Sequence, residues 1–327
     1  MLKDLRVAFI KKKEAALIEV DFDETLKPDE ILGKNVLSLI SSGSERGGFT
    51  QEFQADSYPM ETGSSSIAKV VKVGAEVKGL KEGDLFYHNE HHTLYVKLKA
   101  DDTISVPREV KPEHALFGRY AAVSMTSIYH SAAKPVEKVV VTGLGMVGLM
   151  CAQIADSFGY EVYAVDPSEE RRNIARKTGL VHVGKSLEEW PRLKKQVATM
   201  YECSGNENAL HSAIPYMRKR GEIFQIGVPW KKGSDWDAHT LLYELFYSFI
   251  SIHGGWEWSI PLKSDELHSH SSYGHIHSAM EFLAAERIKV IEEMYELRNP
   301  KECNQVYHDI TVPKMCPTSM MLDWRNF

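Results

Sequence analysis

The first 115 residues alternate hydrophobic and polar positions in short runs, which is the period expected of half-buried β-strands. These runs lie at residues 5–10, 16–22, 31–40, 67–73 and 85–87, with turn residues between them. No part of this region keeps the 3.6-residue period of a long helix. The pattern predicts an irregular all-β unit or small barrel.

The pattern changes after Pro112, where strand-like and helix-like runs begin to alternate. Helices are predicted at residues 113–133, 149–158, 169–177 and 276–285, and strands at 138–142, 161–165, 198–202 and 223–226. Such alternation predicts an α/β unit with a parallel sheet and helices on both faces. Residues 288–327, in which Pro300 and Pro313 act as breakers, again predict strands.

A glycine motif follows the first strand of this alternating region. Gly143, Gly145 and Gly148 have the G-x-G-x-x-G spacing and separate an apolar strand from a helix. Gly143 permits a tight turn, Gly145 leaves room for a pyrophosphate, and Gly148 lets the helix pack on the strand. The helix N-terminus supplies free N–H groups for the phosphates. The predicted phosphate-binding residues are therefore Gly143, Leu144, Gly145, Met146, Val147 and Gly148.

An acidic residue, Asp166, ends the next predicted strand. Its carboxylate can accept the ribose hydroxyls of adenosine and would repel a 2′-phosphate, which favours NAD over NADP. Arg171 and Arg172 leave NADP open, since a basic residue after the acid can bind that phosphate. Asp166 can alternatively be interpreted as a helix cap before Pro167. The three glycines can alternatively be interpreted as a structural turn in an α/β fold that binds no nucleotide.

With these motifs the chain resembles the medium-chain dehydrogenase/reductase superfamily, in particular its zinc-type alcohol and polyol dehydrogenases. The resemblance covers nearly the whole length and rests on residues 63–84, 143–148, 160–166, 202–205, 226–227 and 284–288. It implies a GroES-like, β-rich catalytic domain of residues 1–122 and 288–327. A Rossmann domain with a doubly wound parallel sheet, residues 123–287, would bind NAD(P). The resemblance adds Thr126, Ser204, Gly205 and Gly227 to the cofactor site.

The zinc ligands of that family are not present here. The positions matched to its three catalytic ligands hold Ser42, Ser64 and Ala122, and the span from Phe86 to Tyr95 is too short for its structural zinc lobe. Zinc needs three good donors and an open position, so no metal is expected. Residues 40–46 are similar to a zinc-free subset that includes bacteriochlorophyllide and sugar dehydrogenases.

Without zinc, a side chain that titrates near neutrality must exchange the substrate proton. The histidines of residues 88–92 lie where this resemblance puts the substrate pocket. His92 matches a His-x-x-Tyr-Val pattern of the zinc-free relatives and is the first candidate, with His91 beside it. Ser44 matches the hydroxyl of the family's proton relay. The alternative is that these histidines are solvated loop residues.

A second histidine cluster, residues 268–277, has spacing compatible with metal binding. Its serine-rich surroundings favour a mobile loop instead. Arg119 lies where polyol relatives carry a glutamate, although a surface position on a helix explains it equally well. Trp256 and Trp258 follow two glycines, and we expect a cleft wall, a subunit contact or core packing there.

The composition narrows the class of protein. A chain of 327 residues with 43% hydrophobic and 26% charged residues is typical of two globular domains. No apolar run is long enough for a membrane helix, and the first residues lack the apolar core of a signal peptide. Four scattered cysteines then favour a reducing cytoplasm. A net charge of −6 without a basic stripe argues against nucleic-acid binding.

Together these patterns predict a zinc-independent oxidoreductase that transfers a hydride between NAD(H) and a secondary alcohol or ketone. The polar residues of the expected pocket favour a sugar- or cyclitol-like substrate. One alternative is a zinc-free, NADPH-dependent enone or quinone reductase. Another is a nucleotide-binding sensor or scaffold without chemistry. By resemblance, the chain is expected to form a homodimer or homotetramer.

Overall fold

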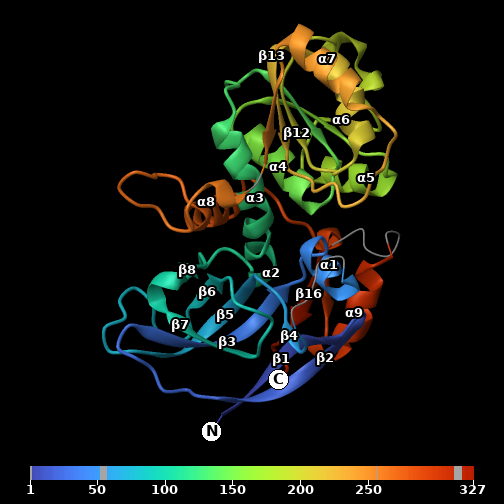
Figure 1. Cartoon of the computed structure of the whole chain (residues 1–327). Helices are drawn as coiled ribbons and strands as arrows, with labels where there is room; N and C mark the ends of the chain where they lie inside the picture. The colour runs from blue at the N-terminus through green and yellow to red at the C-terminus, as the bar shows by residue number, and fades with distance from the viewer. Residues whose placement is uncertain (1, 52–56, 256, 313–318) are drawn as a thin grey trace. The chain divides into compact units, whose positions relative to one another are not determined.

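The computed structural model describes residues 2–51, 57–255, 257–312 and 319–327 (Figure 1). The chain forms two compact units, Met1–Leu116 with Ile291–Phe327, and Phe117–Val290. A border after residue 122, as expected from the sequence, would fall inside helix α3 (Phe117–His130). The compact units divide before that helix instead.

The first unit is built on two mainly antiparallel sheets, in which β15 and β16 pair in parallel. One has the order β2-β1-β4, and the other has the order β15-β16-β3-β5-β6-β8 with β7 also paired to β3. The strands are β1 (Leu2–Lys11), β2 (Glu14–Phe22), β3 (Glu30–Leu39), β4 (Met60–Glu61), β5 (Ser66–Val73), β6 (Leu85–His88), β7 (Tyr95–Lys99), β8 (Ile104–Ser105), β15 (Tyr295–Arg298) and β16 (Ser319–Asp323). The five strands predicted in the first 115 residues are confirmed.

Among its described residues, this unit has three short α-helices: α1 (Ser44–Thr50), α2 (Pro112–Ala115) and α9 (Cys303–Ile310). Helix α9 corrects the prediction of strands alone in residues 288–327. Cys303, Val306, Tyr307 and Ile310 recur at helical spacing and are buried in one core with Phe9 and Phe49. A helix of eight residues gives a signal too short to separate from strand patterns. Pro313 lies outside the described residues.

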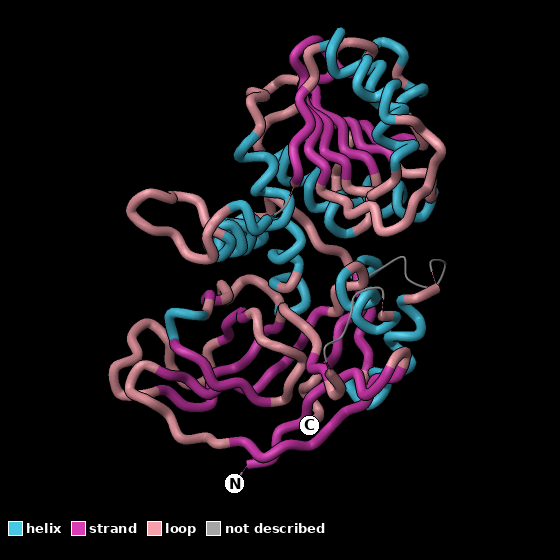
Figure 2. Tube along the Cα trace, viewed as in Figure 1, coloured by secondary structure: helices cyan, strands magenta, loops and turns pink. Residues whose placement is uncertain are grey.

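The second unit is a doubly wound α/β structure. Its parallel sheet has the order β11-β10-β9-β12-β13-β14, which is strand order 3-2-1-4-5-6. The strands are β9 (Lys138–Thr142), β10 (Glu161–Val165), β11 (His182–Gly184), β12 (Val197–Glu202), β13 (Met217–Gln225) and β14 (Ser251–Gly254). The α-helices are α3, α4 (Met146–Ser157), α5 (Glu169–Lys177), α6 (Glu207–Ala213), α7 (Ala238–Ser248) and α8 (Ser272–Ala284). Helices cover both faces of this sheet (Figure 2), which confirms the predicted α/β class.

Three predicted helices differ from the structure, and the one predicted at 149–158 begins earlier, at Met146. The run at 113–133 is divided into α2 and α3 at Leu116. Helix α8 begins at Ser272 rather than at residue 276, because the Ser271 hydroxyl accepts the N–H of Gly274 at 3.0 Å and caps the helix earlier. Among the described residues, no helix combines the length and apolar character needed to cross a membrane.

Candidate functional site

The glycine motif forms the turn between β9 and α4, and its three glycines have different surroundings. Gly143 has a φ of +83°, which favours glycine, and a Cβ there would lie 2.7 Å from the Cβ of Ser204. A Cβ on Gly148 would lie 1.8 Å from the Gly143 carbonyl oxygen. Gly145 is the N-cap of α4, and a Cβ there would meet no protein atom within 4 Å. The packing therefore requires two of the glycines, whereas Gly145 borders open space at a helix N-terminus.

The other residues of the motif are held by neighbouring elements. The Leu144 N–H donates to Asp166 at 2.7 Å. Met146 and Val147 are half-buried in the first turn of α4, and the Val147 carbonyl accepts the Ser124 hydroxyl at 3.2 Å. The sequence analysis missed Ser124, since a serine inside a helix carries no distinctive pattern. This contact fastens α3 to the start of α4, whose first N–H groups have no partner within the helix.

Asp166, at the end of β10, is 2% exposed. Its Oδ2 accepts the Leu144 N–H, and its Oδ1 accepts the Ser168 N–H at 2.8 Å. The cap of α5 is Ser168, not Asp166. The Arg171 guanidinium lies 3.4 Å from Oδ2, and Arg172 donates to the Asp166 carbonyl at 2.8 Å. Asp166 therefore fixes the glycine turn to the next strand and has a cation beside its charge.

A buried glutamate, Glu202, organises the end of β12; the sequence analysis included it in the run 202–205 but gave it no role of its own. Its carboxylate accepts the N–H groups of Ser204 at 2.8 Å and Gly205 at 2.9 Å, the Thr142 hydroxyl at 3.2 Å and the Gln225 amide at 2.5 Å. This network holds Ser204 against the glycine turn at the point where the strand order reverses. An acid as the last residue of a buried, otherwise largely apolar strand was the available signal.

Gly205 and Gly227 approach each other closely. Gly205 has a φ of +64°, and a Cβ on Gly227 would lie 2.3 Å from the Gly205 nitrogen. Gly143, Ser204, Gly205 and Gly227 thus meet at the carboxyl ends of β9, β12 and β13. This is the edge of a doubly wound sheet at which ligands bind.

Thr126 lies elsewhere on α3. Its hydroxyl is buried, 3.5 Å from the Ala122 carbonyl and 3.4 Å from the His275 ring. It therefore faces α8, and Ser124 on the same helix supplies the contact to the glycine motif.

The second histidine cluster is divided between the loop before α8, which holds the exposed His268 and His270, and helix α8 itself. His275 and His277 lie within α8, and His275 stacks on Tyr129 with ring centroids 5.0 Å apart. Burial, with the nearby charges of His270 and His130, lowers the pKa of His275 to about 4. No three histidine, cysteine, aspartate or glutamate side chains form a metal-binding group in the described part of the chain.

Arg119 is held by an ion pair rather than left on the surface. It donates to both carboxylate oxygens of Glu257, at 2.6 Å for one of them, and its guanidinium lies 6.0 Å from the centre of the Trp258 ring. Trp256 lies outside the described residues.

The β-rich unit has a cavity of about 330 Å³ beside α1. It is lined by Phe9, Ser44, Glu45, Gly48, Met60, Glu61, Thr62, Gly63, Ser64 and His91. Ser44 is the first residue of α1, and its exposed hydroxyl donates to Ser41 at 2.7 Å. The exposed His91 ring has its Nδ1 3.0 Å from the Gly63 carbonyl oxygen. The structure therefore brings two of the three candidate catalytic residues to one cavity.

The third candidate, His92, lies outside the cavity, behind the residues that line it. It is fully buried, is not among the lining residues, and has its Nε2 3.1 Å from Glu45. The expectation that His92 contacts a substrate directly is therefore corrected, because its ring does not reach the cavity. His88 is also buried, with its Nε2 2.8 Å from the Asn35 side chain. Burial and the nearby His92 lower the pKa of His88 to about 3.

Glu45 is a buried acid that the sequence analysis did not single out. Its Oε1 accepts the Ser41 N–H at 2.6 Å, and its Oε2 accepts His92 at 3.1 Å, Thr62 at 3.1 Å and Tyr307 at 2.5 Å. Burial acts to raise the pKa of Glu45, but attraction to His92 and these hydrogen bonds outweigh it and lower the pKa. The carboxylate is therefore ionised at neutral pH.

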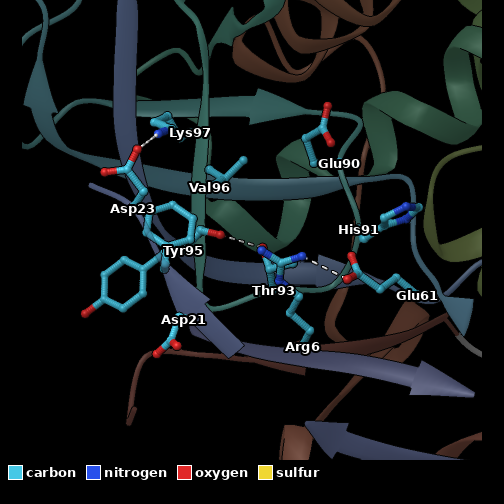
Figure 3. Close-up of a pocket in the computed structure, with 11 residues that line it drawn as sticks. Arg6, Asp21, Asp23, Glu61, Glu90, His91, Thr93, Tyr95, Val96 and Lys97 are labelled. Carbon is cyan, nitrogen blue, oxygen red and sulfur yellow. Dashed lines mark hydrogen bonds and ion pairs between the residues drawn. The ribbon is translucent and has the colours of Figure 1, made fainter. Parts of the chain in front are cut away.

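A second cavity, of about 320 Å³, lies beside β1, β2 and β7 (Figure 3). Its charged residues largely pair with one another, since Arg6 donates to Glu61 at 2.8 Å and Lys97 to Asp23 at 3.0 Å. Glu61 and His91 line both cavities. The charged groups of the second cavity are thus largely occupied by one another. The first cavity, which Ser44 lines and which is called the Ser44 cavity below, is therefore the candidate substrate site.

Comparison with known proteins agrees with this geometry. A family model described as zinc-binding dehydrogenase matches residues 146–259. The L-threonine 3-dehydrogenase of Vibrio parahaemolyticus is 25% identical over 221 residues, which cover 55% of this chain and 63% of that protein. The D-arabitol-phosphate dehydrogenase of Enterococcus avium is 22% identical over 291 residues, or 76% of this chain and 82% of that protein. The chain belongs to the medium-chain dehydrogenase/reductase superfamily.

Solved structures of the superfamily share the fold along the whole chain. Galactitol-1-phosphate dehydrogenase from Escherichia coli has a TM-score of 0.79 at 17% identity, covering 98% of this chain and 99% of its own. Acetophenone reductase from Geotrichum candidum, in complex with NAD, has a TM-score of 0.78 at 17% identity, covering 99% and 98%. CAD from Helicobacter pylori, with NADP(H), has a TM-score of 0.75 at 15% identity, covering 99% of each chain. Both nicotinamide cofactors therefore occur on this superfamily fold. In sequence, the chain spans less than two thirds of the threonine dehydrogenase that it matches.

Proposed function

We propose that this superfamily member is a zinc-independent oxidoreductase that transfers a hydride between NAD(H) and a secondary alcohol or ketone of a polar, sugar- or cyclitol-like substrate. The observation that carries the proposal is the glycine turn, in which Gly145 borders open space while Gly143 and Gly148 pack against their neighbours. A pyrophosphate fits this position because the N-terminus of α4 offers unpaired N–H groups and a positive dipole end. The nicotinamide, when bound, accepts or donates the hydride.

The residues present do not fit a catalytic zinc. The positions matched to the ligands of zinc-type relatives hold Ser42, Ser64 and Ala122, and neither a neutral hydroxyl nor a methyl group is among the usual zinc ligands. The proposal therefore assigns proton transfer to side chains of the chain itself.

Ser44 and His91 are the residues that we assign to the substrate oxygen. The Gly63 carbonyl can only accept a hydrogen bond, so His91 carries its proton on Nδ1 and its Nε2 presents a lone pair. That nitrogen can take the proton of an alcohol as the hydride leaves and return it in the reverse reaction. The Ser44 hydroxyl, at the start of α1, can hold the same oxygen by a hydrogen bond.

The test combines metal analysis, titration with NADH and NADPH, and turnover of a panel of alcohols, sugars and ketones. We expect no stoichiometric zinc, tighter binding of NADH, and turnover of polyhydroxy alcohols. His91→Asn should abolish turnover but preserve NADH binding. The exposed His268, paired with Asp265 at 2.8 Å, provides His268→Asn as the matched control with full activity. Retained zinc, or an active His91→Asn variant, would contradict the proposal.

A second candidate is a zinc-free, NADPH-dependent reductase of activated C=C bonds. Arg171 beside the Asp166 carboxylate favours it, because this guanidinium offsets the charge that would repel a 2′-phosphate. Tighter binding of NADPH than NADH, together with reduction of enones but not ketones, would decide for this function. NADH binding without turnover of any tested substrate would instead leave a nucleotide-binding sensor or scaffold.

We also propose that two copies of the chain associate through β14. This strand is the last of its sheet, and all four of its residues are exposed. Helix α7, which precedes this strand in the chain, has no buried residue, and Phe246 and Tyr247 are 74% and 58% exposed. A second copy related by a two-fold axis would pair with the free edge of β14 and cover these rings. Light scattering should give a dimer mass, and Phe246→Glu should give a monomer.

A further inference from the structure

The Glu45 carboxylate can still accept a ligand. It lines the Ser44 cavity, and most of its hydrogen bonds come from residues that do not line this cavity. Oε2 accepts three donors, from His92, Thr62 and Tyr307, and is fully occupied. Oε1 accepts only the Ser41 N–H among the described residues, so one of its lone pairs remains. A hydroxyl or ammonium group of a bound molecule can donate to it.

Glu45 pairs with His92, and of these two side chains only Glu45 lines the cavity. The other carboxylate of the cavity, Glu61, forms an ion pair with Arg6 at 2.8 Å. No lysine or arginine is among the lining residues. His92 donates one N–H to Glu45, but its Nδ1 is enclosed without a hydrogen-bond partner. The His92 ring is not among the lining residues, so Glu45, and not His92, faces the cavity.

We propose that Glu45 makes this cavity selective for neutral or cationic alcohols and excludes phosphorylated or carboxylated ones. This inference rests on the proposed function and specifies its substrate class. A buried carboxylate that faces the cavity, with its partner His92 outside the lining, raises the free energy of a phosphate bound there, and the weak solvent screening inside a protein preserves the effect. The selectivity differs from that of the similar enzymes named for D-arabitol phosphate and galactitol 1-phosphate.

The experiment compares the kcat/KM of each polyol with that of its phosphate, using D-arabitol and D-arabitol phosphate, then galactitol and galactitol 1-phosphate. We expect a preference on the order of tenfold to a hundredfold for the neutral member of each pair. Glu45→Gln should reduce this preference, with thermal melting to confirm that the variant folds.

Ser64 provides a second variant that leaves the Glu45 network untouched. Its side chain is exposed and lines the same cavity. Ser64→Lys adds a positive charge and should shift the preference toward the phosphates by roughly tenfold. Ser64→Gln, of similar length but neutral, is the matched control and should keep the wild-type preference.

The outcomes separate the two proposals. Equal or better turnover of the phosphates by the wild type would overturn the charge selectivity and preserve the dehydrogenase function. If the protein turned over neither the polyols nor their phosphates, with NAD or with NADP, the proposed function would be overturned. Calorimetric binding of the same pairs would then decide the selectivity alone, and tighter binding of the phosphate would refute it.

Discussion

The two glycines that flank the first turn of α4 should respond to the same substitution in opposite ways. A methyl group on Gly148 would lie 1.8 Å from the backbone oxygen of Gly143, so the turn must open by about 1.2 Å to reach even 3.0 Å. Overpacking against backbone costs about 3 kcal/mol, the upper end of the usual range. We expect Gly148→Ala to lower the melting temperature by roughly 6–12 °C.

Gly145→Ala should leave the fold intact and impair binding instead. Gly145 has a φ of −62°, which alanine adopts freely, and no protein atom lies within 4 Å of the new methyl group. Alanine at an N-cap costs no more than about 1 kcal/mol. The methyl group would enter the space assigned to the pyrophosphate, so we expect NADH affinity to fall at least about tenfold, or about 1.4 kcal/mol.

Differential scanning fluorimetry and NADH fluorescence titration of both variants measure the two effects. The wild-type protein and Gly43→Ala serve as references, since Gly43 is also a helix N-cap, has a φ of −73°, and would place a Cβ with no atom within 4 Å. Wild-type NADH affinity in Gly145→Ala would refute the placement of the pyrophosphate. An unchanged melting temperature in Gly148→Ala would refute the packing argument.

Three further predictions concern buried polar groups. Tyr307→Phe removes the phenol that donates to Glu45 at 2.5 Å and should lower the free energy of unfolding by about 1–3 kcal/mol in urea titrations. Glu202→Gln should cost a similar amount and also weaken NADH binding in fluorescence titrations, because it loosens the Ser204 turn. His88 stays neutral when folded, with its pKa lowered to about 3, whereas the unfolded histidine takes a proton near pH 6.5. Its contribution to stability is thus complete above pH 6.5 and is lost as the pH falls toward 3, by up to about 1.4 kcal/mol per pH unit. Urea midpoints between pH 8 and 5 should show a smaller decline in His88→Gln than in the wild type.

Local pattern predicted much of the fold. The run before Gly143, the spacing of the motif and the helix that follows are adjacent in sequence, so periodicity and glycine chemistry are enough to place them. Helix α9 was missed because eight residues give too few periods. The start of α8 was missed because the Ser271 cap depends on one hydroxyl that sequence alone does not orient.

The sequence by itself determined that a strand, a glycine turn and a helix form a dinucleotide-binding motif, because each of these elements depends on neighbouring residues. Only the tertiary structure decided which of the adjacent His91 and His92 faces the cavity, because both lie in the irregular connection between β6 and β7, whose path is set by the elements packed around it. It also decided that Glu45 accepts a hydrogen bond from Tyr307, a residue 262 positions away. Such contacts depend on how distant elements pack, which no local pattern encodes.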